Sequence, residues 1–235
     1  MFHLKKMIQS VSPDVIFFQE TMSDSSRAKE VFMKCCPPWC CVATHALGFS
    51  RGLVSGWNPL IADFQAYMSS VGILLESRIK DTSDTVKLLN CYRPYKDRLL
   101  FWKTLEESGL LSEPGLIMGG DLNFTFSSRE IWGVKARVDQ CVSFFQSLFS
   151  SSNLVDIEPG VLTPTWRNGR GGDEGISKRL DMFFVNGDLL EHFTRCRSWV
   201  INSVISDHNP ICIKFDYHHE KELYPFKFNH SWLKE

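Results

Sequence analysis

Asp121 and Asn123 follow directly on an apolar run, Leu116 to Met118, and two glycines. The run has the character of a buried strand, which would end by delivering a carboxylate and an amide into a turn. Strand side chains alternate between faces, so these two residues would point to the same side if the extended backbone continued. Such a pair can hold a water molecule and a phosphate oxygen. The alternative is an ordinary turn, because Gly, Asp and Asn are also common turn residues.

Other expected strands also end in groups that can bind metal or move protons. They are Glu20, Tyr92, Asp181 and the adjacent pair Asp207 and His208. Simpler explanations stay open for single members: an exposed strand end for Glu20, an ion pair with Arg179 for Asp181, and a turn with an incidental imidazole for His208. Asp181 is the most informative, because a carboxylate within an apolar strand is costly without a partner.

Taken together, these groups match the requirements of phosphodiester hydrolysis. That reaction needs an activated water, neutralisation of charge on the non-bridging oxygens and stabilisation of the leaving alkoxide. Hard oxygen ligands such as Glu20 suit Mg²⁺ or Mn²⁺. The sequence therefore favours a metal-dependent hydrolytic site.

The apolar periodicity predicts how a mixed α/β chain would position this site. Helices are expected over residues 4–11, 23–35, 97–108 and 138–149. Strands are expected at residues 15–18, 52–57, 71–75, 85–92, 115–118, 179–185 and within 204–215. Most of the candidate residues then stand at the ends of apolar strands, so we expect them to meet at one end of the fold.

Composition excludes some classes of protein. The 235 residues are 43% hydrophobic and 13% aromatic, which is ample for a folded core of one domain. The formal charge of -1 and the pI near 6.7 give no global basic field, so any phosphate binding must be local. The first residues contain no apolar stretch long enough for secretion or membrane insertion.

Eight cysteines without a secretion signal favour a reducing intracellular compartment. Four of them gather at residues 35–41, a spacing that could also bind zinc. The remaining cysteines are scattered singly, so we interpret the group as small buried apolar residues.

Five motifs carry a resemblance to a known family. In chain order they are Gln19-Glu20, Tyr92-Arg93-Pro94, Gly120 to Asn123, Leu180-Asp181 and Ser206 to His208. With them the sequence resembles the endonuclease/exonuclease/phosphatase superfamily of deoxyribonuclease I and the abasic-site endonucleases. The resemblance implies a two-sheet α/β sandwich with the site at one end.

A finer similarity, from about Leu4 onward, is to the endonuclease domain of plant non-LTR retrotransposons. Its marks are Thr165-Trp166 before a glycine-rich loop, Arg179 to Asp181, Ser206 to Pro210 and the tail Pro225 to Asn229 with Trp232. It implies a domain over residues 1–216 and a tail, 217–235, that in relatives leads towards a reverse transcriptase.

The resemblance also implies roles for the motif residues. Glu20 would ligate Mg²⁺, with Mn²⁺ as an alternative ion, and Asp207 would be a further metal ligand. Asp121 would orient or deprotonate the attacking water, and Asn123 would assist it.

On the phosphate side, Asp181 would support the imidazole of His208, which would bind and polarise the phosphate. Tyr92 would contact the phosphate or the leaving group. Contacts to DNA would come from Thr165, Arg167, Arg170, Lys178 and Arg179. A solvated hairpin tip is the alternative for the loop that carries most of these residues.

One expected segment is missing from the resemblance. Family members begin with a strand that ends in a Trp-Asn-like motif followed by Gly-Leu, whereas this sequence matches from the helix after it. We therefore expect a form truncated at its N-terminus, with an open seam where neighbouring strands keep unpaired backbone groups. Arg51 before Gly52 departs more mildly from the usual Gly-Gly.

The resulting hypothesis is a Mg²⁺-dependent DNA endonuclease domain of retrotransposon origin that nicks DNA, acts as a monomer without an obligate protein partner or membrane, and works in the nucleus. A catalytically inactive relic that binds nucleic acid is the first alternative. A phosphatase of small phosphoesters or lipids with the same fold is the second.

Overall fold

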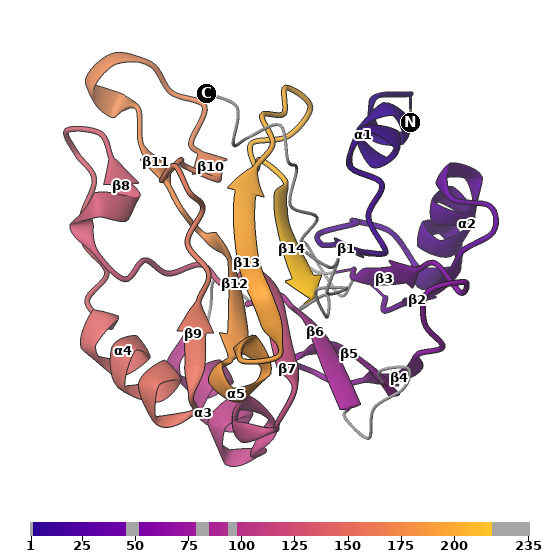
Figure 1. The fold of residues 1–235 in the computed structure, drawn as a ribbon. Coiled ribbons are helices and arrows are strands. Elements are labelled where there is room, and N and C mark those ends of the chain that lie inside the picture. The colour runs from indigo at the N-terminus through magenta and orange to yellow at the C-terminus, as the bar shows by residue number, and fades with distance from the viewer. Residues whose placement is uncertain (1, 46–51, 79–84, 94–97, 218–235) are drawn as a thin grey trace, which may run out of the picture.

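The computed structural model describes residues 2–45, 52–78, 85–93 and 98–217 (Figure 1). Arg51 and the tail from residue 218 onward lie outside these ranges, so the predictions about them are not examined by the structure. None of the described helices is long and apolar enough to cross a membrane.

A six-stranded mixed sheet forms the centre of the fold, in the order β4-β5-β6-β7-β12-β9. Its strands are β4 Gln65–Met68, β5 Gly72–Arg78, β6 Thr85–Cys91, β7 Leu116–Asp121, β9 Leu154–Asp156 and β12 Asp181–Asn186. Among the described strands of this sheet only β6 and β7 pair in parallel, and helix α3, Arg98–Glu107, lies between them in the chain. The predicted strand-helix-strand passage into Asp121 is therefore confirmed.

One face of this sheet is covered by α3 and by α4, Val142–Ser151. Trp102 of α3 is fully buried there and packs edge to face against Phe124 and Phe145. The alternating strand residues Leu89, Met118 and Phe184 point into the same cluster. The aromatic residues counted in the sequence thus form the main core on the helix side.

Two smaller sheets cover the opposite face. One has the order β1-β3-β2 and the other pairs β13 with β14. Their strands are β1 Val15–Phe18, β2 Cys40–Ala43, β3 Val54–Trp57, β13 Phe193–Val200 and β14 Ile211–Tyr217. The two-sheet α/β sandwich is confirmed, with its second layer divided into two parts (Figure 1).

Both parts of the second layer keep a free strand edge. Among the described residues, β1 pairs only with β3, and β14 pairs only with β13. Val86 and Leu88 of the central strand β6 are half-buried, although they point to the inner face and touch the apolar clusters beneath the small sheets. Within the described residues, β1 and β14 are therefore edge strands.

The remaining elements lie at the periphery. Helix α1, Phe2–Val11, leads into β1, and α2, Ser25–Cys35, is capped by Asp24, whose carboxylate accepts from the Arg27 N–H at 2.9 Å. A short sheet of β10 Trp166–Arg167, β11 Ser177–Lys178 and β8 Ile131–Trp132 extends from the end of the sandwich.

Candidate functional site

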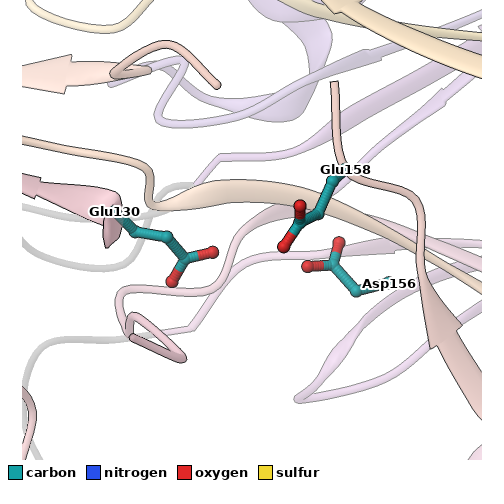
Figure 2. A group of neighbouring side chains, drawn as sticks. All are labelled: Glu130, Asp156 and Glu158. Carbon is teal, nitrogen blue, oxygen red and sulfur yellow. The ribbon is translucent and has the colours of Figure 1, made fainter. Parts of the chain in front are cut away.

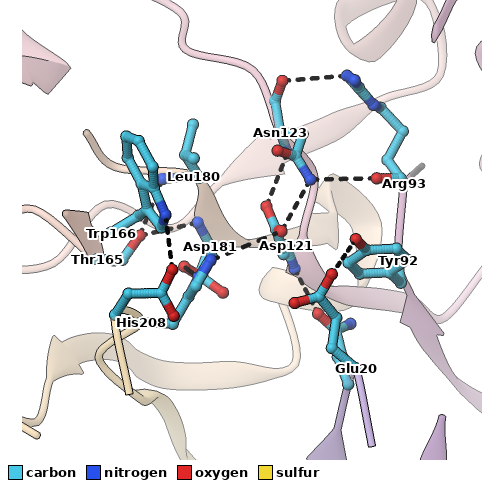
Figure 3. Close-up of polar contacts among 12 residues, drawn as sticks. Glu20, Tyr92, Arg93, Asp121, Asn123, Thr165, Trp166, Leu180, Asp181 and His208 are labelled. Carbon is cyan, nitrogen blue, oxygen red and sulfur yellow. Dashed lines mark hydrogen bonds and ion pairs between the residues drawn. The ribbon is translucent and has the colours of Figure 1, made fainter. Parts of the chain in front are cut away.

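Four segments far apart in the sequence meet at one end of the sandwich (Figure 3). Asp121 at the end of β7 and Asp181 at the start of β12 are direct partners in the antiparallel register. His208 reaches them from the loop between β13 and β14. Glu20 follows β1 and faces the group from the other side, beside Tyr92.

Asn123 holds the Asp121 carboxylate in place. Its backbone N–H donates to Asp121 Oδ1 at 3.0 Å and its side-chain amide to Oδ2 at 2.8 Å. The extended backbone expected here does not continue, because Asn123 has a left-handed φ of 52°. This turn, rather than strand alternation, brings the amide onto the carboxylate.

The environment of Asp121 raises the pKa of its carboxyl group to about 7. Burial is the largest cause, and the facing Asp181 carboxylate adds to it, while His208 and the Asn123 N–H act in the opposite direction. A carboxylate with a pKa near neutrality is a suitable general base at physiological pH. Asp121 can therefore accept a proton from water.

His208 lies between the two aspartates. Its Nδ1 is 2.8 Å from Asp181 Oδ2, and its Nε2 is 4.0 Å from Asp121 Oδ2. Burial opposes the charged imidazole, but the hydrogen bond and charge of Asp181, with further help from Asp121 and Asp207, raise the pKa of His208 to about 9. At neutral pH the ring is therefore cationic, as phosphate binding requires. Asp181 thus pairs with His208 rather than with Arg179, the alternative partner considered from the sequence.

The raised pKa of His208 predicts a specific pH dependence of stability. The folded value of about 9 lies above the ordinary 6.5, so this stabilisation is fully present below pH 6.5 and is lost as the pH rises to about 9. NMR titration of the imidazole, assigned with His208→Gln, should give a midpoint near 9. Asp181→Asn should move the midpoint towards 6.5, and a wild-type midpoint near 6.5 would contradict the assignment.

Glu20 and Tyr92 form the opposite wall of the site. The Tyr92 hydroxyl donates to Glu20 Oε1, and Glu20 is exposed with a positive φ of 50°. Glu20 also contributes to the raised pKa of Asp121, so three carboxylates share this end of the sandwich. Carboxylate oxygens are ligands that hard divalent cations prefer, so Glu20 would hold such an ion with water completing its coordination.

Two positioning residues had no role assigned from the sequence. Gln19 accepts the Asp121 N–H at 2.7 Å and donates to Asn90 at 2.8 Å and to the Cys91 carbonyl at 2.9 Å, so it joins β1 to β6 and β7. Arg93 is fully buried and donates to the Asn123 carbonyl at 3.2 Å. Both residues belong to the motifs that carry the family resemblance. No other feature of the sequence pointed to their roles.

Thr165 is not placed to contact DNA, contrary to the prediction, because it is fully buried. Its hydroxyl accepts the N–H groups of Leu180 at 2.9 Å and Asp181 at 3.0 Å, and its carbonyl accepts the Asn209 N–H at 2.6 Å. Thr165 thus fixes the backbone at Asp181 and beside His208.

The role of Asp207 as a metal ligand stays a prediction, and in the structure its exposed side chain contacts β10. Its carboxylate accepts from the Trp166 indole at 3.2 Å, and its carbonyl accepts the Arg167 N–H at 3.0 Å. Among the described residues, neither Asp207 nor Glu20 belongs to a group of three acidic or imidazole side chains close enough to share an ion. The geometry gives Asp207 a structural role in docking β10 against the His208 loop.

Arg179 is also withdrawn from the expected DNA contacts. Arg179 is 1% exposed, and its guanidinium donates to Asp156 at 2.6 and 2.7 Å and to Glu130 at 2.7 Å. Glu130, Asp156 and Glu158 form the group of acidic residues in Figure 2, the only such close group in the described part of the chain. Because Arg179 neutralises two of its members, we interpret the group as a structural ion-pair network.

The other predicted DNA contacts lie on the extending short sheet. Arg167 on β10 and Arg170 in the following loop are exposed, and Lys178 on β11 is half-buried. Arg170 lies 4.0 Å from Glu174 of the same loop, a weak surface pair. The Arg167 N–H donates to the Asp207 carbonyl, so the short sheet that carries Arg167 lies beside His208.

Comparison with known proteins agrees with this geometry. A family model described as "Endonuclease/Exonuclease/phosphatase family" matches residues 1–208. The Xenopus laevis "Transposon TX1 uncharacterized 149 kDa protein" is 28% identical over 152 residues. That match covers 61% of this chain and 11% of the Xenopus protein, so the chain spans only a small part of that relative.

Solved structures share the fold. The endonuclease domain of TRAS1, a telomere-specific non-LTR retrotransposon, superposes with a TM-score of 0.67 at 19% identity, covering 94% of this chain and 93% of that one. D. rerio TDP2 in complex with a single-strand DNA product gives 0.63 at 13% identity, covering 92% and 90%. ANGEL2, a 2',3'-cyclic phosphatase, gives 0.58 at 13% identity, covering 92% and 85%. The chain belongs to the endonuclease/exonuclease/phosphatase family.

Proposed function

We propose that this chain is a metal-dependent DNA endonuclease domain of non-LTR retrotransposon origin, which nicks a phosphodiester bond. The observation that carries the proposal is the His208 imidazole between the paired Asp121 and Asp181 carboxylates, with Glu20 opposite. The TX1 relative and the TRAS1 neighbour support the retrotransposon origin. A nuclear location follows as part of the same proposal, and the plant origin stays a prediction.

Each residue of the site has a chemical task in this proposal. Asp121 accepts a proton from the water that attacks phosphorus, and Asn123 keeps the carboxylate aligned. His208, held cationic by Asp181, binds a non-bridging oxygen. Glu20 would hold Mg²⁺, which supplies further neutralisation of phosphate charge when it is bound. The exposed side chains of Arg167 on β10 and Arg170 in the following loop would contact the DNA backbone.

Supercoiled plasmid provides the direct test. The purified chain should convert plasmid to the nicked form with Mg²⁺ and not with EDTA. His208→Ala should lower the rate about 10³-fold, because it removes the cation at the phosphate. His192→Ala changes an exposed imidazole of another loop and should leave the rate unchanged. Equal nicking by wild type and His208→Ala would contradict the proposal.

A phosphatase is the second candidate, because the ANGEL2 neighbour acts as a 2',3'-cyclic phosphatase on the same fold. The same protein assayed on a soluble phosphomonoester and on plasmid separates the two functions. Faster turnover of the monoester in a reaction that depends on His208 would favour the phosphatase. Binding of plasmid without turnover of either substrate would favour the inactive relic.

A further inference from the structure

The loop between β13 and β14, residues 201–210, presents two aliphatic side chains to solvent. Val204 is 95% exposed and Ile205 is 63% exposed. Val204 is the most exposed large apolar side chain in the described part of the chain. Single exposed apolar residues are common on protein surfaces, but adjacent ones on a loop that carries a site residue call for a functional explanation.

The backbone of this loop is fixed by internal hydrogen bonds. The Ile201 N–H donates to the Pro210 carbonyl at 2.8 Å and closes the base. The Ser203 N–H donates to Asn209 Oδ1 at 2.9 Å, and the His208 N–H donates to Ser206 Oγ at 3.1 Å. These bonds tie the apolar tip to the residue that carries the imidazole.

The position of the tip determines what it can reach. The loop joins the end of β13 to the start of β14 (Figure 1), and its His208 contacts Asp181 of the site. Val204 is four residues from His208, so its backbone lies within about 14 Å of that residue even if the chain were fully extended. A duplex whose phosphate contacts His208 has several base steps within this range, since base pairs rise by about 3.4 Å.

The chemistry of the tip selects bases rather than phosphates. Val204 and Ile205 carry no charge or hydrogen-bonding side-chain atoms, whereas phosphate contacts come from charged, polar and backbone donors. Aliphatic side chains inserted at a base step unstack it and kink the duplex. Resting on the DNA substrate of the proposed function, we propose that Val204 and Ile205 form a wedge that enters a base step beside the scissile phosphate.

The test uses the whole chain and a duplex of about 30 base pairs with 2-aminopurine near its centre, in EDTA and at fixed salt. Wild type should bind the duplex and raise 2-aminopurine fluorescence through unstacking. The double variant Val204→Ser/Ile205→Ser should bind about tenfold more weakly and lose the fluorescence rise. Its affinity for the corresponding single strand should change less, because no duplex step has to be opened.

Val161→Ser is the matched control, because Val161 is 79% exposed outside this loop. It should keep both the affinity and the fluorescence signal, and both variants should keep the wild-type Tm. Unchanged duplex affinity and fluorescence in the double variant would overturn the wedge. Because binding is measured without turnover, a failure of the endonuclease proposal would be seen separately as a lack of plasmid nicking.

Discussion

Asp121→Asn should lower phosphodiester hydrolysis about 10³-fold, because an amide cannot accept a proton from water. Asp121 is 6% exposed, and the pKa of its carboxyl group is raised to about 7. The measurement is the initial rate of plasmid nicking at pH 8 with Mg²⁺. The exposed Asp63→Asn, just before β4, is the matched control and should keep the wild-type rate.

The same substitution should not lower stability at pH 8. Folding raises the pKa of the Asp121 carboxyl group, so the folded state holds this proton more tightly than the unfolded state does. The free energy of unfolding therefore falls as the pH rises from about 4 to about 7, and it is lowest above pH 7. The amide that replaces the carboxyl group carries no charge and avoids this loss. Thermal unfolding at pH 8 should therefore give a Tm at or above that of wild type. A Tm below that of wild type would contradict the expected stability, whereas a wild-type rate in this variant would contradict the assignment of Asp121 as the base.

Arg179→Met should lower the free energy of unfolding by about 3–5 kcal/mol, because it removes the guanidinium that bridges two buried or half-buried carboxylates. Glu130 is 1% exposed and would keep an uncompensated charge. Urea unfolding measures the effect. Arg179→Lys keeps the charge but loses the planar fork that binds Asp156 through two nitrogens, so an intermediate loss is expected.

Arg170→Met controls for the removal of an arginine as such. Its side chain is 70% exposed and makes only the weak pair with Glu174 among the described residues, so its substitution should change stability by less than about 0.5 kcal/mol. A loss at Arg179 as small as the loss at Arg170 would show that the buried network contributes nothing.

The proposed catalytic group was predictable because most of its members follow or interrupt an apolar run. Apolar runs that end in Asp121 and Glu20, and an Asp181 that alternates with apolar neighbours, are signals within a few residues of sequence. Strand pairing then places Asp181 directly opposite Asp121. The position of His208 between them agrees with the role that the resemblance implied.

The misassigned residues share a different property. Arg179 and Thr165 were predicted as DNA contacts because the family resemblance implied that role for them and for the glycine-rich loop between them. Their partners are remote: Glu130 is 49 residues from Arg179, and Asp181 is 16 residues from Thr165. No local pattern reveals such a partner, so a buried polar residue looks the same in sequence as an exposed one.

Strand β13 was missed for a related reason. Its eight residues, Phe193–Val200, mix apolar with polar and cationic side chains, and only Ser198 among them is fully buried. This composition resembles a surface segment. Its pairing with β14 over seven registered positions, not its propensity, makes it a strand.

The sequence by itself determined the α/β class, the main strands and helices, and the residues that meet at the end of the sandwich. These follow from apolar periodicity and from short motifs, which are local properties of the chain. Only the tertiary structure decided which polar residues face the substrate and which are buried as supports. It also set the left-handed turn that aligns Asn123 with Asp121 and the apolar tip at Val204. The physical reason is that hydrogen bonding, burial and pKa depend on groups brought together from distant segments.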